Sequence, residues 1–247
     1  MLPGPRISTF PAILLAFLPA GPLAAQGGAV HVHDNPGWFV YSGEHPFARG
    51  WTLNPEVQAR RADVLATWQE LQLRQGVGYA LSSAVNLAAA YTYARSYSYG
   101  PGAEPFPYPE HRIHEQVTVS HRAGKWKLGH RFRVDHRFLG ELPDPPRPRV
   151  ARWEYETRLR YRLQPRREFR DWHLRIAAES LIRIGKGRAW DQQRTYAGIG
   201  RKLWKHLTVE AGYMHRLNVP GDGPFFEHDH IFHLIFSSDA PLRRGIQ

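Results

Sequence analysis

A strict two-residue alternation of apolar and charged side chains runs through Lys125–Phe138, "KWKLGHRFRVDHRF". One set of alternate residues includes Phe132 and Phe138, and the other includes Arg131 and Arg133. Because successive side chains of a β-strand point to opposite faces, this period predicts a strand with one apolar and one charged face. The question that decides the fold is which of these faces meets water.

The same alternation recurs in ten segments from about Arg49 to Ser237, with no amphipathic helical stretch between them. The links between segments alternate in length. Short turns are expected at Ser82–Ala84, Ala123–Gly124, Gln164–Phe169 and Trp204–Lys205, and longer Pro-rich links at Gly100–Glu110, Gly140–Arg149 and Val219–His228. Short turns on one rim and mostly long links on the other indicate an all-β fold, an antiparallel up-and-down β-barrel of about ten strands. Twelve strands is the alternative. Trp38–Tyr41 could add a strand, but an eleventh would break the even count expected of such barrels.

Alternation alone allows a soluble lipocalin-like barrel with its apolar face inside, or a transmembrane barrel with that face outside. The segments are about 11–14 residues long, and a tilted strand needs about 9–11 residues to cross a membrane. An arginine facing lipid at mid-bilayer costs about 2–4 kcal/mol, so the row of Arg131, Arg133 and Arg137 cannot face lipid. We therefore expect a transmembrane barrel with its charged face in the lumen.

Aromatic residues near the ends of the apolar rows are typical of the girdles that flank the membrane-spanning band. The periplasmic girdle, beside the short turns, should contain Trp126, Tyr161, Trp172 and Trp204, and the outer girdle Tyr97, Tyr99, Phe138, Trp153 and Trp190.

The N-terminus has the layout of a secretory signal peptide: Arg6, an apolar core at Ile13–Leu18, and small residues up to Ala25. The expected organisation is a signal peptide at 1–25, an N-terminal periplasmic segment at 26–48, the barrel at 49–238 and a C-terminal tail at 239–247.

The predicted location is the outer membrane of a Gram-negative bacterium. The expected partners are membrane lipids and lipopolysaccharide, with the barrel-assembly machinery and periplasmic chaperones during biogenesis. Behind an export signal, the formal charge of +11 favours anionic lipid or polysaccharide over nucleic acid, and we expect a monomer.

The charged rows predict a network of ionised side chains in the lumen. Its members are Arg131, Arg133, Glu154, Glu156, Arg158, Arg160, Arg175, Glu179, Arg194 and Glu210. Small residues on another wall, including Gly76, Ala88 and Ala90, leave room for long arginines to reach across. The network could close a narrow lumen by mutual pairing, or it could line an open pore that favours anions. Closure is the preferred interpretation.

Other candidate sites are weaker. His228-x-His230 and His31-x-His33 could each place two imidazoles on one strand face, but no third ligand is implied, so we expect no metal and no cofactor. Ser120-His121 is the only neighbouring pair that suggests a lipid-modifying Ser/His site, and adjacent strand residues point to opposite faces. We expect no catalytic residues. Arg95 interrupts an outward row of tyrosines and could bind lipopolysaccharide phosphate.

These residues also resemble a known family. The resemblance runs from "EHRIHEQVTVSHRAGKWKLGHRFRVDHRF" through "YETRLRYRL" and "DQQRTYAGIGRKLWKHLTVEAGYMHR" to "HDHIFHLIFS". Its most specific parts are Glu110-His111-Arg112, Arg131-Phe132-Arg133, Asp191-Gln192-Gln193-Arg194 and Glu210-Ala211-Gly212-Tyr213. The chain is similar to the bacterial outer-membrane β-barrels grouped as domain of unknown function 2490. The resemblance implies a fold and an outer-membrane location but no activity.

Three functions follow as hypotheses. The first is an outer-membrane barrel with an Arg/Glu-filled lumen and a structural or passive role, including passage of anions. The second is an outer-membrane enzyme that modifies lipid A. The third is a soluble periplasmic barrel that binds a ligand as lipocalins do.

Overall fold

The structure, a computed structural model, describes residues 30–99, 106–143, 145–185, 189–219 and 225–242 of the 247-residue chain. The segment predicted to be a signal peptide lies outside these residues. Apart from a 3₁₀ turn at Asp63–Leu65, the regular structure in this part of the chain is β-strand, and none of it is a helix long and apolar enough to span a membrane. The strands are β1 (Val30–Asp34), β2 (Gly37–Gly43), β3 (His45–Ala48), β4 (Trp51–Ala62), β5 (Thr67–Ala80), β6 (Val85–Ser96), β7 (Tyr108–Ala123), β8 (Trp126–Glu141), β9 (Arg152–Phe169), β10 (Trp172–Ile184), β11 (Trp190–Trp204), β12 (Leu207–Asn218) and β13 (Phe225–Ser238).

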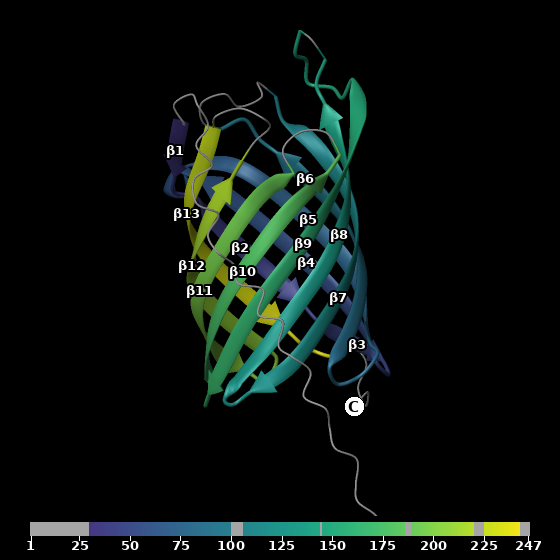
Figure 1. The fold of residues 1–247 in the computed structure, drawn as a ribbon, viewed down its shortest axis with the longest axis vertical. Helices are drawn as coiled ribbons and strands as arrows, with labels where there is room; N and C mark the ends of the chain where they lie inside the picture. The colour runs from purple at the N-terminus through teal and green to yellow at the C-terminus, as the bar shows by residue number, and fades with distance from the viewer. Residues whose placement is uncertain (1–29, 100–105, 144, 186–188, 220–224, 243–247) are drawn as a thin grey trace, which may run out of the picture.

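The sheet closes into a barrel of eleven strands, β2 and β4–β13 (Figure 1). Consecutive strands from β4 to β13 pair antiparallel, and β2 fills the gap between the two ends. On one side β2 pairs antiparallel with β4, as in Val40 opposite Gln58, and on the other it pairs parallel with β13, as in Tyr41 opposite Phe236. Strands β1 and β3 lie outside the ring, paired with β13 and β4.

The count of eleven is close to the expected ten, but it is odd, and the barrel starts at Gly37 of β2 rather than near Arg49. The even count holds only if every pair of neighbours is antiparallel, and the parallel β2–β13 pair removes that condition. The N-terminal segment, expected on the short-turn side, instead begins at the opposite rim, because β2 runs in the same direction as β13.

Strands β1 and β2 together form one extended segment along β13. Val30 is opposite Phe225 and Gly37 is opposite Phe232, which is the same offset of 195 residues in both strands. The backbone N–H of Phe232 donates to the carbonyl of Pro36, at 3.0 Å, and so continues the ladder across the interruption. β1 thus extends beyond the end of β4 at the long-link rim (Figure 1).

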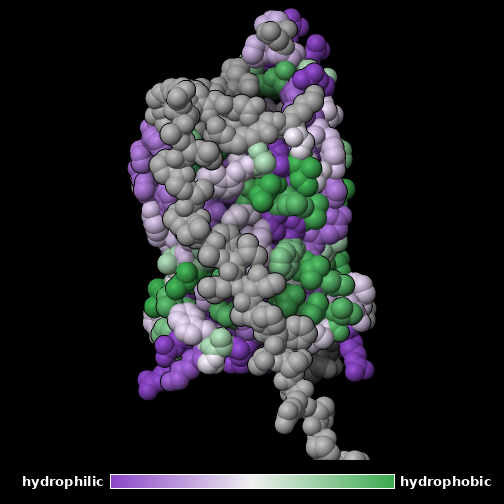
Figure 2. Space-filling view, viewed as in Figure 1, coloured by the Kyte–Doolittle hydropathy of each residue, from purple (hydrophilic) through white to green (hydrophobic). Residues whose placement is uncertain are grey.

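The predicted alternation is present, with the apolar face outward. In β8 the side chain of Phe132 is 52% exposed, whereas its neighbour Arg133 is 6% exposed. Every barrel strand carries at least one exposed large apolar residue, and Figure 2 shows such residues gathered at mid-height and near the lower end of the visible face. Among the described residues, 19 polar or charged side chains are buried against 10 apolar ones. A lipocalin-like barrel would have the opposite distribution.

One turn lies further along the chain than expected. The sequence places the β9–β10 turn at Gln164–Phe169, but β9 continues to Phe169 and the chain turns at Arg170, which has a φ of 56°. Pro165 does not end the strand, because it stays in register with Leu128 of β8 and only the ladder to β10 is interrupted beside it. Pro lacks the N–H that a second ladder would need.

Two aromatic residues lie outside their predicted girdles, and in both cases the strand ends at a different residue than expected. Tyr161 lies mid-barrel rather than at the short-turn rim, since β9 continues for eight residues beyond it, and its ring centroid is 5.0 Å from that of Phe132. Tyr99 follows the end of β6 and contacts Gln69 close to Arg216, and burial raises the pKa of its phenol.

Candidate functional site

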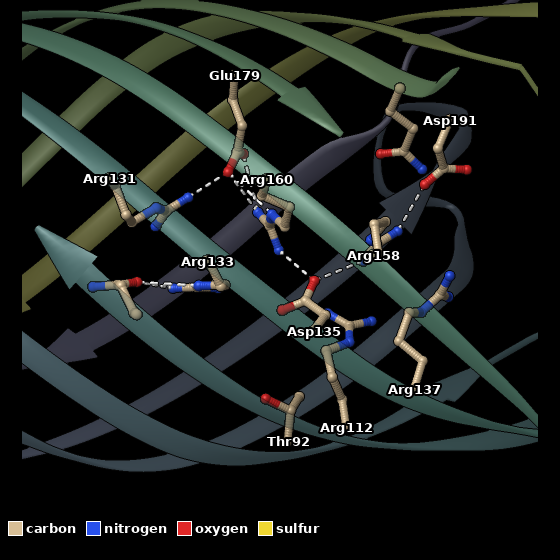
Figure 3. A network of polar contacts seen from close by, with 12 residues as sticks. Thr92, Arg112, Arg131, Arg133, Asp135, Arg137, Arg158, Arg160, Glu179 and Asp191 are labelled. Atoms are coloured by element: carbon tan, nitrogen blue, oxygen red, sulfur yellow. Dashed lines mark hydrogen bonds and ion pairs between the residues drawn. The ribbon is translucent and has the colours of Figure 1, made fainter. Parts of the chain in front are cut away.

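The lumen of the barrel holds a network of ionised side chains contributed by the inner faces of β7–β11 (Figure 3). At its centre, Arg160 donates to Glu179 at 2.9 Å and to Asp135 at 3.3 Å. Asp135 is completely buried and also accepts a hydrogen bond from Arg158, at 3.2 Å. Buried charges are tolerated when opposite charges and hydrogen bonds surround them, and here one carboxylate joins two guanidinium groups.

The network continues toward the long-link rim as an unbroken series of ion pairs. Its successive links are Arg158–Asp191 (3.0 Å), Asp191–Arg183 (2.6 Å), Arg183–Glu156 (2.7 Å), Glu156–Arg137 (2.5 Å) and Arg137–Glu110 (2.7 Å). Arg112 also pairs with Glu110, at 2.7 Å. These side chains come from β7, β8, β9, β10 and β11, so the series spans five adjacent strands near their long-link ends.

Glu179 of β10 holds three arginines. Arg131 donates to it at 2.5 Å, Arg160 makes a two-pronged contact with both carboxylate oxygens, and Arg194 lies 3.8 Å away. Side chains of β8, β9, β10 and β11 therefore meet at one carboxylate.

A second cluster lies around Glu210 of β12. Its carboxylate accepts hydrogen bonds from Arg175 at 2.5 Å and from the Tyr196 hydroxyl, and it contacts the His173 ring at 2.6 Å. The Tyr196 hydroxyl can reach Glu210 only because the adjacent backbone carries no side chains: a Cβ added at Gly198 would lie 2.1 Å from this hydroxyl, and one added at Gly212 would lie 2.4 Å from it.

The N-terminal strand β2 adds an aromatic residue to the lumen. Trp38 is 2% exposed, and the guanidinium carbons of Arg60, Arg194 and Arg216 lie 3.9, 5.7 and 5.7 Å from its ring centroid. An indole face attracts cations, so Trp38 stabilises arginines that approach from three different strands. Sequence reasoning missed this residue because β2 had been placed outside the barrel.

Most of the predicted network residues lie together, with Glu154 as the exception. Nine of the ten are on the inner wall: Arg131, Arg133, Glu156, Arg158, Arg160, Arg175, Glu179, Arg194 and Glu210. Glu154 is exposed near the start of β9, beside Arg152 and Glu141, because β9 begins only two residues earlier. The main partners that were missed are Glu110, Asp135 and Asp191; the period-two pattern had placed Asp135 on the charged face but could not assign its partners.

A cavity of about 440 Å³ lies inside the barrel beside this network. Twelve arginines and five glutamates line it, and Gly76, Ala88 and Ala90 of β5 and β6 form part of the adjoining wall. Two of the arginines have no carboxylate partner. Arg133 donates twice to the amide oxygen of Gln116, at 3.0 and 2.6 Å, and Arg162 makes no hydrogen bond or ion pair within the described residues. The cavity is therefore strongly cationic.

The two His-x-His motifs meet at the outer surface of the long-link rim, where β1 lies against β13. His31 Nδ1 is 2.9 Å from His228 Nε2, His33 Nδ1 is 3.4 Å from His230 Nε2, and His215 Nε2 of β12 is 3.2 Å from His228 Nδ1. We call these five residues the histidine ladder. The Tyr213 hydroxyl contacts His230 at 2.7 Å, and the sequence neighbours Asp34 and Asp229 belong to the opposite face of the same strands. No three metal-binding side chains in the described part of the chain are arranged to hold an ion.

The other candidates are separate from the lumen. Arg95 is exposed on the outer face of β6, with its guanidinium 5.7 Å from the Tyr97 ring centroid. His121 stacks on His130 at 5.2 Å, on the face of the sheet opposite to its neighbour Ser120, so these two residues do not form a Ser/His pair.

A closed, largely antiparallel barrel with an apolar exterior and an ionised interior is the class of protein that these observations define. A family model described as "Protein of unknown function (DUF2490)" matches residues 35–223, and the chain belongs to this family. No curated protein and no solved structure matches the chain.

Proposed function

We propose that this protein is an outer-membrane β-barrel whose lumen is closed to free flow by its network of arginines and carboxylates. The observation that carries the proposal is the outward placement of large apolar residues on all eleven barrel strands, such as Ile113, Phe132 and Phe232, each about half exposed. A monomer in water rarely exposes so extensive an apolar surface, whereas lipid tails solvate it well. The signal-like N-terminal sequence supports export from the cytoplasm.

Barrel size supports a filled lumen. Eight strands leave an interior that side chains just fill, and barrels of 16–18 strands leave an aqueous channel. Eleven strands lie between these limits, so long arginines can meet carboxylates from other strands near the middle. The series of ion pairs from Glu110 to Glu179 crosses five strands, and we infer that it obstructs the long-link half of the lumen.

Residual ion flow through such a lumen should favour anions, since arginines outnumber carboxylates around the cavity. We propose that conductance is small and passive. Removal of an ion pair in the series should increase it.

An outer-membrane location would bring the exposed face of the barrel into contact with lipopolysaccharide. Arg95 lies among tyrosines near the long-link end of β6, where a guanidinium can pair with a lipopolysaccharide phosphate while its stem packs on Tyr97. A protein of this class depends on the barrel-assembly machinery and periplasmic chaperones for insertion, and we propose that it then functions as a monomer.

Fractionation of cells that express the full chain tests the proposal. The protein should separate with the outer membrane on a density gradient, require detergent for extraction, and shift in gel mobility on boiling, as folded membrane barrels do. Recovery from the soluble periplasm without detergent would instead favour a soluble binding barrel. Lipid A of altered composition in a strain that lacks the gene would favour the enzyme hypothesis.

A further inference from the structure

Four arginines form a block of like charge on the lumen wall. Across the β8–β9 ladder, Arg131 lies directly opposite Arg162, and Arg133 lies directly opposite Arg160. Like charges in directly opposite positions of a sheet destabilise it. The carboxylates that reach this block are Glu179 and Asp135, and each is shared with a further arginine, Arg194 and Arg158 respectively.

The protein's own carboxylates therefore do not neutralise the block. Arg133 is buried and donates to the neutral Gln116, and Arg162, within reach of the Glu179 charge, makes no hydrogen bond or ion pair among the described residues. Both guanidinium groups line the 440 Å³ cavity. A guanidinium offers a planar fork of donors that matches the two oxygens of a carboxylate or phosphate, so these groups are suited to an oxyanion.

We propose that this cavity binds a small polyanion, a molecule that carries two or more carboxylate or phosphate groups. Its volume lies within the range of ligand pockets, about 300–1,000 Å³, and exceeds what a single phosphate would fill. The small side chains of Ala88 and Ala90, on β6 two strands away from β8, keep the adjoining wall clear. A ligand with two acidic groups can pair with the arginine block and still fit against that wall.

The ligand reaches the cavity from the short-turn rim. The lining includes Ser42, Gly43 and Ser237, at the ends of β2 and β13 on that side, whereas toward the long-link rim it includes Glu110 and Arg137, which are paired with each other. In the orientation predicted from the aromatic girdles, the short-turn rim faces the periplasm.

Isothermal titration calorimetry on the folded protein in detergent tests the site, with citrate and pyrophosphate as probes and ionic strength held constant with NaCl. We expect saturable binding of at least one probe at one site per chain. Binding of citrate alone identifies a carboxylate ligand, binding of pyrophosphate alone a phosphate ligand, and binding of both the shared oxyanion chemistry. Arg133→Gln and Arg162→Gln should each weaken binding at least about tenfold, a change of 1.4 kcal/mol. Arg149→Gln, in the exposed β8–β9 link, should leave affinity unchanged.

A cavity-filling variant covers the case in which an arginine variant fails to fold. Ala88→Phe retains every charge and should also weaken binding at least tenfold, because the larger side chain occupies the cavity. Wild-type protein that binds neither probe, or Ala88→Phe and the arginine variants with wild-type affinity, would overturn the proposal. The assay does not depend on where the protein resides, so its failure would leave the proposed outer-membrane function standing.

Discussion

Replacement of Glu179 by glutamine should destabilise the barrel more than any comparable change at its surface. Glu179 accepts four hydrogen bonds from Arg131 and Arg160 and lies 3.8 Å from Arg194. Glutamine has nearly the same shape but carries no charge, so three buried guanidinium groups lose their common counter-charge. Removal of one partner from a buried ion pair costs about 3–5 kcal/mol. Because glutamine keeps one acceptor oxygen, we expect a loss of about 3 kcal/mol, at the low end of that range.

The matched control is Glu168→Gln. Glu168 pairs with Arg166 at 3.3 Å, but their side chains are 70% and 36% exposed. Exposed pairs contribute about 0–1 kcal/mol, so this variant should unfold almost like the wild type. Urea unfolding in lipid vesicles, followed by tryptophan fluorescence, gives both free energies.

A double variant separates the destabilisation caused by an unpaired buried charge from that caused by lost packing. Arg131 has Glu179 as its single carboxylate partner, so Glu179→Gln combined with Arg131→Gln removes one of the stranded guanidinium groups. This combination should recover about 1 kcal/mol relative to Glu179→Gln alone, within the range of coupling energies between contacting residues. The reasoning is refuted if Glu179→Gln is no more destabilising than Glu168→Gln, or if the second substitution adds its full separate loss.

Three further predictions concern other parts of the barrel. Gly198→Ala should lower stability by about 1–3 kcal/mol through overpacking against the Tyr196 hydroxyl, while Gly129→Ala, whose Cβ would meet nothing closer than 3.7 Å, should be tolerated; equal urea midpoints would contradict this. Acidification to about pH 5 should release β1 from β13, because protonation of neighbouring rings in the histidine ladder removes the acceptors of their mutual hydrogen bonds and places like charges side by side. Lower protection of β1 amides against hydrogen exchange at low pH, after correction for the pH dependence of the intrinsic exchange rate, with a smaller loss in a His228→Asn variant, would support this, and unchanged protection would oppose it. Arg137→Gln, which opens the ion-pair series, should raise the conductance of the protein in planar bilayers, and an unchanged current would argue against closure by the series.

The faces of the strands could be predicted from the sequence, but their number could not. In β8, the alternation of Phe132 with Arg131 and Arg133 determines which side chains share a face, since the side-chain period of a strand is two whatever its neighbours are. The row in β2 is short, follows Pro36, and closes the barrel by a parallel pairing with β13 on one side and an antiparallel pairing with β4 on the other. Such a pairing, about 195 residues away along the chain, leaves no local signal.

In the lumen network, too, the face of a side chain could be predicted from the sequence, whereas its partners could not. The inward position of Glu179 follows from its own strand, but its partner Arg131 lies 48 residues earlier, on a strand that does not adjoin β10. Which charges meet across the lumen depends on strand register and on closure of the ring. Strand ends were also uncertain, so Glu154 and Tyr161 were assigned to wrong depths.

The central claim is that the apolar face of the barrel contacts lipid and the charged face lines the lumen. The chain contains no cysteine, so single cysteines can be introduced for spin labels without background. Labels at 130, 131, 132, 133 and 134 in β8, on protein in lipid vesicles, should alternate in accessibility to oxygen, which concentrates in the bilayer. We predict high accessibility at 130, 132 and 134 and low accessibility at 131 and 133. High accessibility at 131 and 133, or no alternation along the strand, would contradict the account.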